Sequence, residues 1–205
     1  MAHHHHCHGE HDHDHAEDPA MLYSLYQKID TEKLECLNES EEGSGKTVFK
    51  AWDDRLDKTK FVESDVDEEL LIYVPFTGSV KLKGVVLIGG EDEYHPRELR
   101  LFKNRPPLGF DDLRGEPDQS IQLSRDTAGT LEYPVKVTKF NGVTSLLMYI
   151  PSNLGAETTK IYYIGLRGEF AQAQRQGIVI TSYEARPNPA DHKTSDYNPV
   201  GGFVS

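Results

Sequence analysis

The stretch LLIYVPFTGSVKLKGVVLIGG, residues 70–90, is rich in β-branched and aromatic side chains, which favour strands. Turn-forming residues divide it into two expected strands, 69–76 and 79–88. The run from Val85 to Ile88 is apolar at every position, as expected for a centrally placed strand. Gly84 interrupts the second strand, and we expect a bulge or bend there.

Six further segments have the length and the flanking turn residues of strands. Their side chains alternate in polarity where this can be tested: Leu99 and Leu101 are apolar, whereas Arg100 between them is charged. Asn141 and Gly142 are suited to a type I′ hairpin turn between two of the segments. The segments are residues 97–103, 119–124, 131–140, 143–150, 158–167 and 178–185.

Helical signals are short and few. Asp30 is placed to cap a helical turn over residues 33–37, and another turn or two is expected over 169–177. Residues 41–60 have the composition of a loop. Because no long amphipathic helix separates the expected strands, the βαβ architecture of a parallel sheet is excluded. We therefore expect an all-β fold, an antiparallel β-sandwich of about eight strands with jelly-roll closure.

Length and charge limit the class of protein. A chain of 205 residues supports one sizeable core, and a net charge of −12 disfavours binding to nucleic acid or anionic membranes. Basic surfaces of other proteins are the expected partners. No apolar stretch approaches the roughly 20 residues that span a bilayer, and no signal peptide is apparent. With Cys7 and Cys36 in unrelated contexts, both are expected to be reduced. We expect a monomer in the cytoplasm, with the nucleus as a second compartment.

Residues 1–20 are expected to form a disordered, His-rich leader, because they contain almost no large apolar side chains. The leader could bind Zn²⁺, Ni²⁺ or Cu²⁺ through imidazole, although a structureless leader is the favoured interpretation. The interruption at Cys7 favours a native sequence over an expression tag. The leader histidines are His3, His4, His5, His6, His8, His11, His13 and His15.

Five strings, taken together and in order, resemble the PITH domain family. They are LECLNES (34–40), KFVESDVDEELL (60–71), FTGSVKLKG (76–84), TTKIYYIGLRGEF (158–170) and NPADH (188–192). PITH domains are proteasome-interacting modules first named from the C-terminal half of a thioredoxin-like protein. The resemblance covers roughly residues 21–195 and is strongest to members that consist of the PITH domain alone.

The resemblance implies a sandwich similar to galactose-binding-like domains and association with the regulatory particle of the 26S proteasome. It divides the chain into the leader (1–20), a PITH domain (21–195) and a flexible tail (196–205). This chain has no C-x-x-C motif, so the redox activity of thioredoxin-linked relatives is not expected here. The C-terminal sequence GGFVS also differs from the basic, His-ended tail of those relatives.

Residues 63–69 contain five carboxylates directly before an apolar run. A Ca²⁺ loop would need a glycine at its centre, and an acid–base pair would need one acid in an apolar pocket, but neither feature is visible. Drying five acids together without cations would also be costly. We therefore expect a solvated rim, with recognition of a basic partner as the main competing and compatible hypothesis.

No catalytic or phosphate-binding motif is present, and basic residues are dispersed. The better lead is the set of aromatic and arginine side chains near the end of the 158–167 segment, since such residues dominate binding hot spots. The neighbouring Tyr162 and Tyr163 must face opposite sides of their strand, so at least one could be partly exposed. The candidate partner-binding residues are Glu63, Asp65, Asp67, Glu68, Glu69, Tyr163, Arg167, Phe170, His192 and Phe203.

Two functions follow from this sequence. The first is a non-catalytic, cofactor-free adaptor that docks on the 26S proteasome regulatory particle. The second is binding of a small, carbohydrate-like ligand at the loops of the sandwich, which rests on fold analogy and would use Trp52, the only tryptophan. Metal binding by the leader is a third, weaker hypothesis, and no metal site is expected in the fold itself.

Overall fold

A computed structural model describes residues 23–107, 109–110, 113 and 115–171. Within these ranges the chain forms eight strands and four short helical segments, and no helix there is long and apolar enough to span a membrane. The strands are β1 (Glu35–Leu37), β2 (Val62–Glu63), β3 (Leu70–Gly89), β4 (Glu98–Lys103), β5 (Gln119–Gln122), β6 (Glu132–Pro134), β7 (Val143–Ile150) and β8 (Lys160–Ala171). The helical segments are η1 (Tyr26–Lys28), α2 (Ser44–Thr47), η2 (Trp52–Asp54) and η3 (Asp92–Tyr94).

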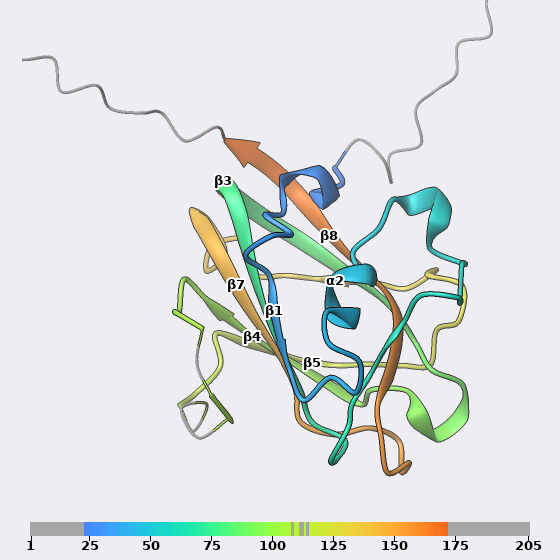
Figure 1. The fold of residues 1–205 in the computed structure, drawn as a ribbon. Helices are drawn as coiled ribbons and strands as arrows, with labels where there is room; N and C mark the ends of the chain where they lie inside the picture. Colours follow the sequence, from blue (N-terminus) through green and yellow to red (C-terminus); the bar gives the residue numbers. More distant parts are fainter. Residues whose placement is uncertain (1–22, 108, 111–112, 114, 172–205) are drawn as a thin grey trace, which may run out of the picture. The chain divides into compact units, whose positions relative to one another are not determined.

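Strand β3 belongs to both layers of the fold, and Figure 1 shows it between β7 and β8. Its first half pairs with β7 on one side and with β1 on the other. The register then shifts between Pro75 and Val80, and the second half pairs with β8 and β6. One layer is β1-β3-β7-β4-β5 and the other is β2-β8-β3-β6, with every pair antiparallel. The expected antiparallel β-sandwich is confirmed.

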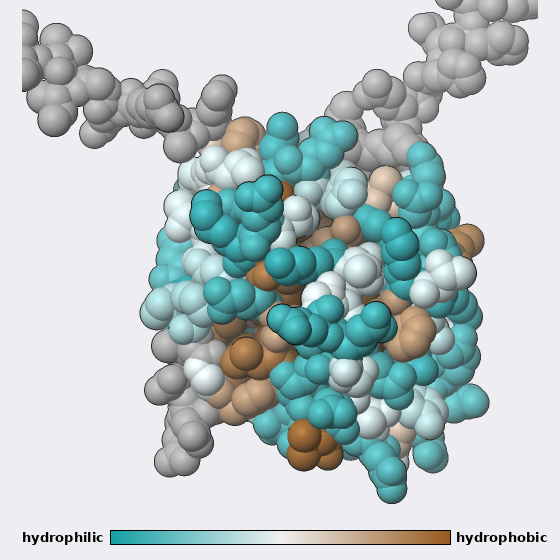
Figure 2. Space-filling view, viewed as in Figure 1, coloured by the Kyte–Doolittle hydropathy of each residue, from teal (hydrophilic) through white to brown (hydrophobic). Residues whose placement is uncertain are grey.

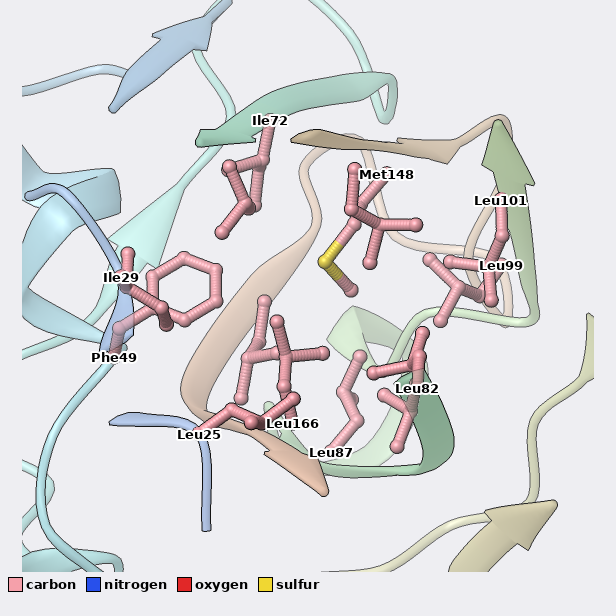
Figure 3. Packing of buried hydrophobic residues seen from close by; sticks show 14 of the residues in the cluster. Leu25, Ile29, Phe49, Ile72, Leu82, Leu87, Leu99, Leu101, Met148 and Leu166 are labelled. Atoms are coloured by element: carbon pink, nitrogen blue, oxygen red, sulfur yellow. The ribbon is translucent and has the colours of Figure 1, made fainter. Parts of the chain in front are cut away.

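The main core lies between the two layers (Figure 3). Leu82 and Leu87 of β3 and Leu166 of β8 are buried there together with Leu101 of β4 and Met148 of β7. Each fully buried side chain of this size contributes roughly 2 kcal/mol of hydrophobic free energy, so the core holds the two layers together. The predicted alternation in β4 is confirmed, because Leu99 and Leu101 are buried and Arg100 is partly exposed.

The two strands expected at 69–76 and 79–88 are one continuous strand, bent where the register shifts. The irregularity expected at Gly84 is confirmed, since the pairing of β3 with β8 slips between Leu82 and Gly84. The four apolar residues 85–88 are all buried, as expected for a centrally placed strand.

Two local predictions are wrong. Residues 35–37 form strand β1 instead of a helical turn, because they pair with residues 71–73 of β3. Asn141 and Gly142 do not join a hairpin: β6 pairs with β3, whereas β7 pairs with β3 and β4. Only Gly142 of this pair has a positive φ, and a type I′ turn needs two such residues.

Several boundaries also differ from expectation. Residues 41–60, expected to be a loop, contain α2 and η2, and the expected strand 131–140 is reduced to β6. Residues 169–171, expected to be helical, continue β8 as a strand. The expected strand 178–185 and the terminal segments 1–20 and 196–205 lie outside the described residues.

Candidate partner-binding site

The acidic loop, residues 63–69, runs from the end of β2 to the start of β3 and is anchored by Asn38. The Asn38 side-chain amide donates hydrogen bonds to the Asp67 carboxylate (2.8 Å) and to the Glu69 carbonyl (2.7 Å). Its side-chain oxygen accepts the Val66 N–H at 3.1 Å, and its backbone carbonyl accepts the Asp65 N–H at 3.0 Å. Asn38 itself has a φ of 65°, a conformation that asparagine tolerates better than most residues. One residue therefore fixes the shape of the loop.

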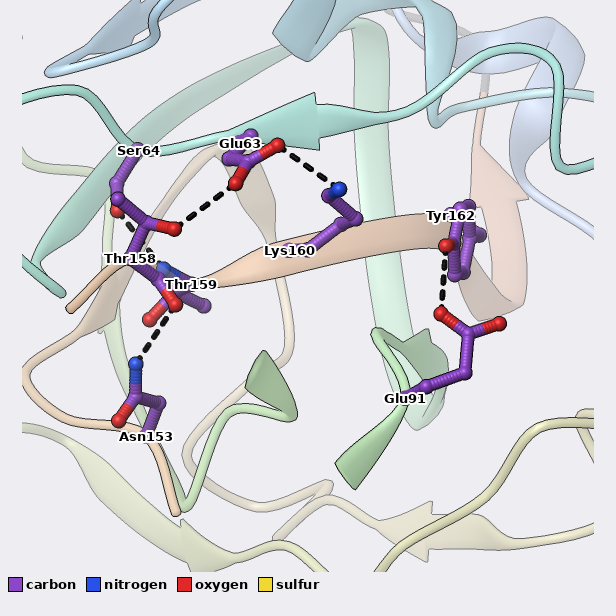
Figure 4. Close-up of polar contacts among 8 residues, drawn as sticks. All are labelled: Glu63, Ser64, Glu91, Asn153, Thr158, Thr159, Lys160 and Tyr162. Carbon is purple, nitrogen blue, oxygen red and sulfur yellow. Dashed lines mark hydrogen bonds and ion pairs between the residues drawn. The ribbon is translucent and has the colours of Figure 1, made fainter. Parts of the chain in front are cut away.

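A second anchor ties the base of the loop to the residues that precede β8 (Figure 4). Ser64 and Thr159 exchange two hydrogen bonds of 2.9 Å, one from the Ser64 N–H to the Thr159 carbonyl and one from the Thr159 N–H to the Ser64 hydroxyl. The Thr159 hydroxyl also donates to the Glu68 carbonyl at 2.7 Å. Both side chains are buried, so these bonds are protected from water.

Besides Asp67, which Asn38 binds, two more of the five carboxylates have structural partners. Glu63 forms an ion pair with Lys160 (2.9 Å) and accepts a hydrogen bond from the Thr158 hydroxyl (2.8 Å), as Figure 4 shows. Glu69 accepts the Tyr149 hydroxyl at 2.6 Å. Burial of the Tyr149 ring, followed by this hydrogen bond, raises the pKa of the phenol. Glu63 and Glu69 therefore stabilise the base of the loop.

The tip of the loop presents Val66 between Asp65 and Asp67. The Val66 side chain is 83% exposed, the most exposed large apolar side chain in the described part of the chain. Figure 2 shows a mainly hydrophilic face on which hydrophobic groups form separate patches. Asn38 holds the backbone at the tip, so the positions of Val66 and Asp65 in the loop are fixed. The tip thus suits a partner with a small apolar depression bordered by cations.

The loop does not assemble a metal site. Among the described residues, no three histidine, cysteine, aspartate or glutamate side chains come together to hold an ion. The carboxylates instead separate into structural and exposed groups. Asp65 and Asp67 are exposed, as expected for a solvated rim, whereas Glu63, Glu68 and Glu69 are partly buried.

Glu91 is held in an ionised state elsewhere on the described surface. It forms an ion pair with Lys58 (2.6 Å) and accepts the Tyr162 hydroxyl at 2.8 Å (Figure 4). These hydrogen bonds, Lys58 first, lower the pKa of Glu91 to about 2. Burial, with the bond to Glu91, raises the pKa of Tyr162 to about 12. Neither group is poised for proton transfer near neutral pH.

The aromatic and arginine candidates are less accessible than expected. Tyr163 is only 3% exposed and packs edge-to-face against Trp52, so it cannot offer its ring to a partner. Burial raises the pKa of its phenol. Arg167 lies over the Trp52 ring, 4.7 Å from its centroid, and its side chain is 11% exposed. Phe170 is partly buried beneath the Lys28 ammonium group. The structure thus removes Tyr163 from the predicted partner-binding residues.

The structure brings together the five predicted acids but leaves the other candidates apart from them or outside its range. His192, Phe203 and all eight leader histidines lie outside the described residues. Sequence reasoning missed Asn38, whose side-chain partners are 28 to 31 residues away along the chain. Such a long-range contact leaves no local sequence signal.

Comparison with solved structures finds proteins of similar fold. The chain is similar to a family 89 glycoside hydrolase from Clostridium perfringens in complex with 2-acetamido-1,2-dideoxynojirmycin, with a TM-score of 0.50 and 12% identity. That match covers 74% of this chain and 15% of the other. It is also similar to a family 32 carbohydrate-binding module from C. perfringens NanJ in complex with galactose, with a TM-score of 0.49 and 5% identity over 70% of this chain and 97% of the other. At such low identity the likeness concerns the fold alone. The fold is an antiparallel β-sandwich, as expected.

Comparison with protein families then identifies the family. The PITH domain profile matches residues 15–187, and the chain belongs to the PITH domain family. It is 57% identical over 183 residues to PITH domain-containing protein 1 of Xenopus laevis. That match covers 89% of this chain and 88% of the relative. The human protein of that name is 52% identical over 189 residues, covering 92% and 90%. The Dictyostelium discoideum protein of that name is 39% identical over 189 residues, covering 92% and 93%. The family resemblance drawn from the sequence is confirmed.

Proposed function

We propose that this protein is a non-catalytic interaction module that associates with the regulatory particle of the 26S proteasome in the cytoplasm and nucleus. The observation that carries the proposal is the acidic loop, whose tip presents an exposed Val66 beside Asp65 on a backbone fixed by Asn38. Membership of the PITH domain family supports the choice of partner.

The physical basis of the proposal is preorganisation. A loop that is already ordered loses little conformational freedom on binding, so more of its contact free energy is retained as affinity. Exposed carboxylates attract a basic partner surface and increase the association rate, while the apolar tip is desolvated at the centre of the contact. Association should therefore weaken as salt concentration rises.

Co-sedimentation with purified 26S particles on glycerol gradients tests the proposal. The wild-type protein should migrate with the regulatory particle at low salt and be partly released at high salt. Migration entirely apart from the particle at both salt concentrations would contradict the proposal.

A charge-reversal pair tests the role of the loop. Asp65→Lys should weaken association by about tenfold, the equivalent of 1.4 kcal/mol, because the Asp65 carboxylate is exposed at the tip. Glu116→Lys, an exposed position before β5, makes the same change in net charge and should bind like the wild type. Equal weakening by both variants would indicate a general charge effect and exclude the loop as the contact.

The carbohydrate hypothesis receives no support at Trp52. The Arg55 and Arg167 guanidinium groups lie over the Trp52 ring, 4.0 and 4.7 Å from its centroid. A ring face covered by a guanidinium group cannot also stack on a sugar. The geometry therefore favours the interaction module as the single proposed function.

A further inference from the structure

A hollow of about 550 Å³ opens on the outer face of the β8–β3–β6 layer, a different surface from the acidic loop. Trp52, Arg55 and Arg167 form its walls, Val86 lies at its base, and Tyr23 and Lys83 border it. This volume is within the range of roughly 300 to 1,000 Å³ that is typical of ligand sites.

Two glycines on this face of the sheet leave room for the side chains that surround the hollow. A Cβ on Gly84 would lie 2.3 Å from the Glu132 carboxylate, and a Cβ on Gly165 would lie 2.6 Å from the Tyr163 hydroxyl. Because Gly84 lacks a side chain, Glu132 can lie against the sheet beside Arg167, and because Gly165 lacks one, the Tyr163 ring can lie over β8. The shape of the hollow thus depends on glycines in two paired strands, β3 and β8.

The loop that forms one edge of the hollow is held by Asp126. Its carboxylate accepts hydrogen bonds from the N–H groups of Ala128 (2.9 Å), Gly129 (2.8 Å) and Leu131 (2.7 Å). Gly129 has a φ of 74°, which a residue with a side chain would adopt only with strain. The edge is therefore preformed, and three of its backbone donors are already used.

The cations of the hollow are not equally neutralised. Arg167 pairs with Glu132 at 3.3 Å, and Lys83 pairs with Glu169 at 2.5 Å. Arg55 instead donates to two backbone carbonyls, those of Trp52 (3.0 Å) and Ala128 (3.3 Å). Among the described residues Arg55 forms no ion pair with a carboxylate. Arg55 is therefore the one cation lining the hollow that has no carboxylate partner in the described part of the chain.

We propose that this hollow binds an acidic side chain from a peptide segment of a partner protein. The carboxylate would meet the Arg55 guanidinium, whose planar donors match carboxylate geometry, and an adjoining apolar side chain would contact the exposed Tyr23 side chain, which also lines the hollow. A single guanidinium without a carboxylate partner suits one carboxylate better than a dianionic phosphate. A peptide C-terminus is less suitable, because C-terminal carboxylates are bound by backbone N–H groups that are free to donate. Here the N–H groups of residues 128, 129 and 131 already donate to Asp126.

This site goes beyond the proposed proteasome association and does not depend on it. The acidic loop suits a basic surface, whereas the hollow suits an acidic one. A single small domain can therefore contact two partners, or two regions of one partner, of opposite charge.

Trp52 provides a specific reporter, since it is the only tryptophan in the chain. The indole N–H resonance of the ¹⁵N-labelled full chain should shift saturably on addition of the capped peptide Ac-Leu-Glu-Leu-NH₂. The isosteric peptide Ac-Leu-Gln-Leu-NH₂ should bind at least about tenfold more weakly, since charge-assisted hydrogen bonds exceed neutral ones. Inorganic phosphate should give no saturable shift. Equal binding of the two peptides, tighter binding of phosphate, or no peptide-induced shift would overturn the proposal.

Three variants locate the binding site. Arg55→Gln should weaken the acidic peptide by about tenfold or more, whereas Lys58→Gln, which removes the same charge outside the hollow, should not. Glu132→Gln should strengthen binding several-fold, and this gain keeps the test decisive even if Arg55→Gln fails to fold. Unchanged affinity in Glu132→Gln would contradict the site.

The acidic residues Glu17 and Asp18 lie close to Tyr23 in the sequence and could compete with a partner. In the full chain, Glu17→Gln/Asp18→Asn should leave the peptide affinity unchanged. A marked increase in affinity would show that the chain's own leader occupies the hollow, which would overturn the assignment to an external partner.

Discussion

At the scale of single residues, Asn38 has the largest influence on the acidic loop. Its side chain satisfies backbone and side-chain groups at Val66, Asp67 and Glu69, and its backbone has a positive φ. The acids of the loop could be recognised from the sequence because all five fall within seven residues. Asn38 could not, because its role depends on contacts made only after β1 pairs with β3.

Two substitutions separate the side chain of Asn38 from its backbone. Asn38→Ala should reduce the free energy of unfolding by about 1–3 kcal/mol, because it removes the hydrogen bonds and strains the backbone. Asn38→Gly should cost less, since glycine accepts the positive φ. Urea denaturation measures both effects, and equal losses would show that the backbone conformation contributes little. Amide exchange of Val66 should accelerate in both variants.

His95 predicts a dependence of stability on pH. It is 1% exposed, its Nδ1 lies 2.7 Å from the Pro96 carbonyl, and its Nε2 accepts the Asp126 N–H at 3.3 Å. Burial lowers the pKa of the imidazole despite opposing contributions from Pro96 and Asp126, and Arg125 lowers it further. The unfolded chain therefore gains a proton first as pH falls. Stability should decrease below about pH 6.5, by at most about 1.4 kcal/mol per pH unit.

The comparison that isolates this effect is between wild type and His95→Gln. Urea denaturation at pH 7.5 and 5.5 should give a larger loss of stability for the wild type than for the variant. Equal losses would show that His95 does not titrate differently in the folded and unfolded states.

At the scale of elements, β3 organises both layers of the sandwich. Its two halves were predicted correctly as strands because their apolar patterns are local. Their continuity was not predicted, because the bend between Pro75 and Val80 depends on β7 and β8 taking over the pairing on either side of it. Residues 35–37 were predicted incorrectly for a related reason: pairing with β3 overrides the helical preference of the segment.

The junction of β3 and β8 predicts a site that does not tolerate a side chain. A Cβ on Gly168 would lie 2.2 Å from the Lys81 carbonyl oxygen, which is backbone and cannot rotate away. Gly168→Ala should therefore destabilise the fold by about 2 kcal/mol or more. Gly115→Ala, where the nearest atom is the flexible end of Arg105, should be nearly neutral. A melting temperature of Gly168→Ala equal to that of Gly115→Ala would contradict the close approach of the two strands.

At the scale of the whole molecule, the chain is strongly acidic, with a net charge of −12, yet its described surface includes one hollow with an uncompensated cation. The composition of the chain predicted its acidic character correctly, but it did not predict a hollow with an unpaired arginine. The burial of Tyr163 was equally hidden, because it requires η2 to bring Trp52 onto the outer face of β8. Family membership followed from five short strings, since these are local features of the sequence.

The most direct measurement of the central claim is the affinity of purified 26S proteasome for Val66→Asp and for Leu56→Asp. Both residues are exposed apolar side chains, but only Val66 lies at the tip of the acidic loop. If the loop is the docking surface, Val66→Asp should bind at least about tenfold more weakly than wild type, and Leu56→Asp should bind like wild type. Wild-type affinity in the Val66→Asp variant would contradict the account.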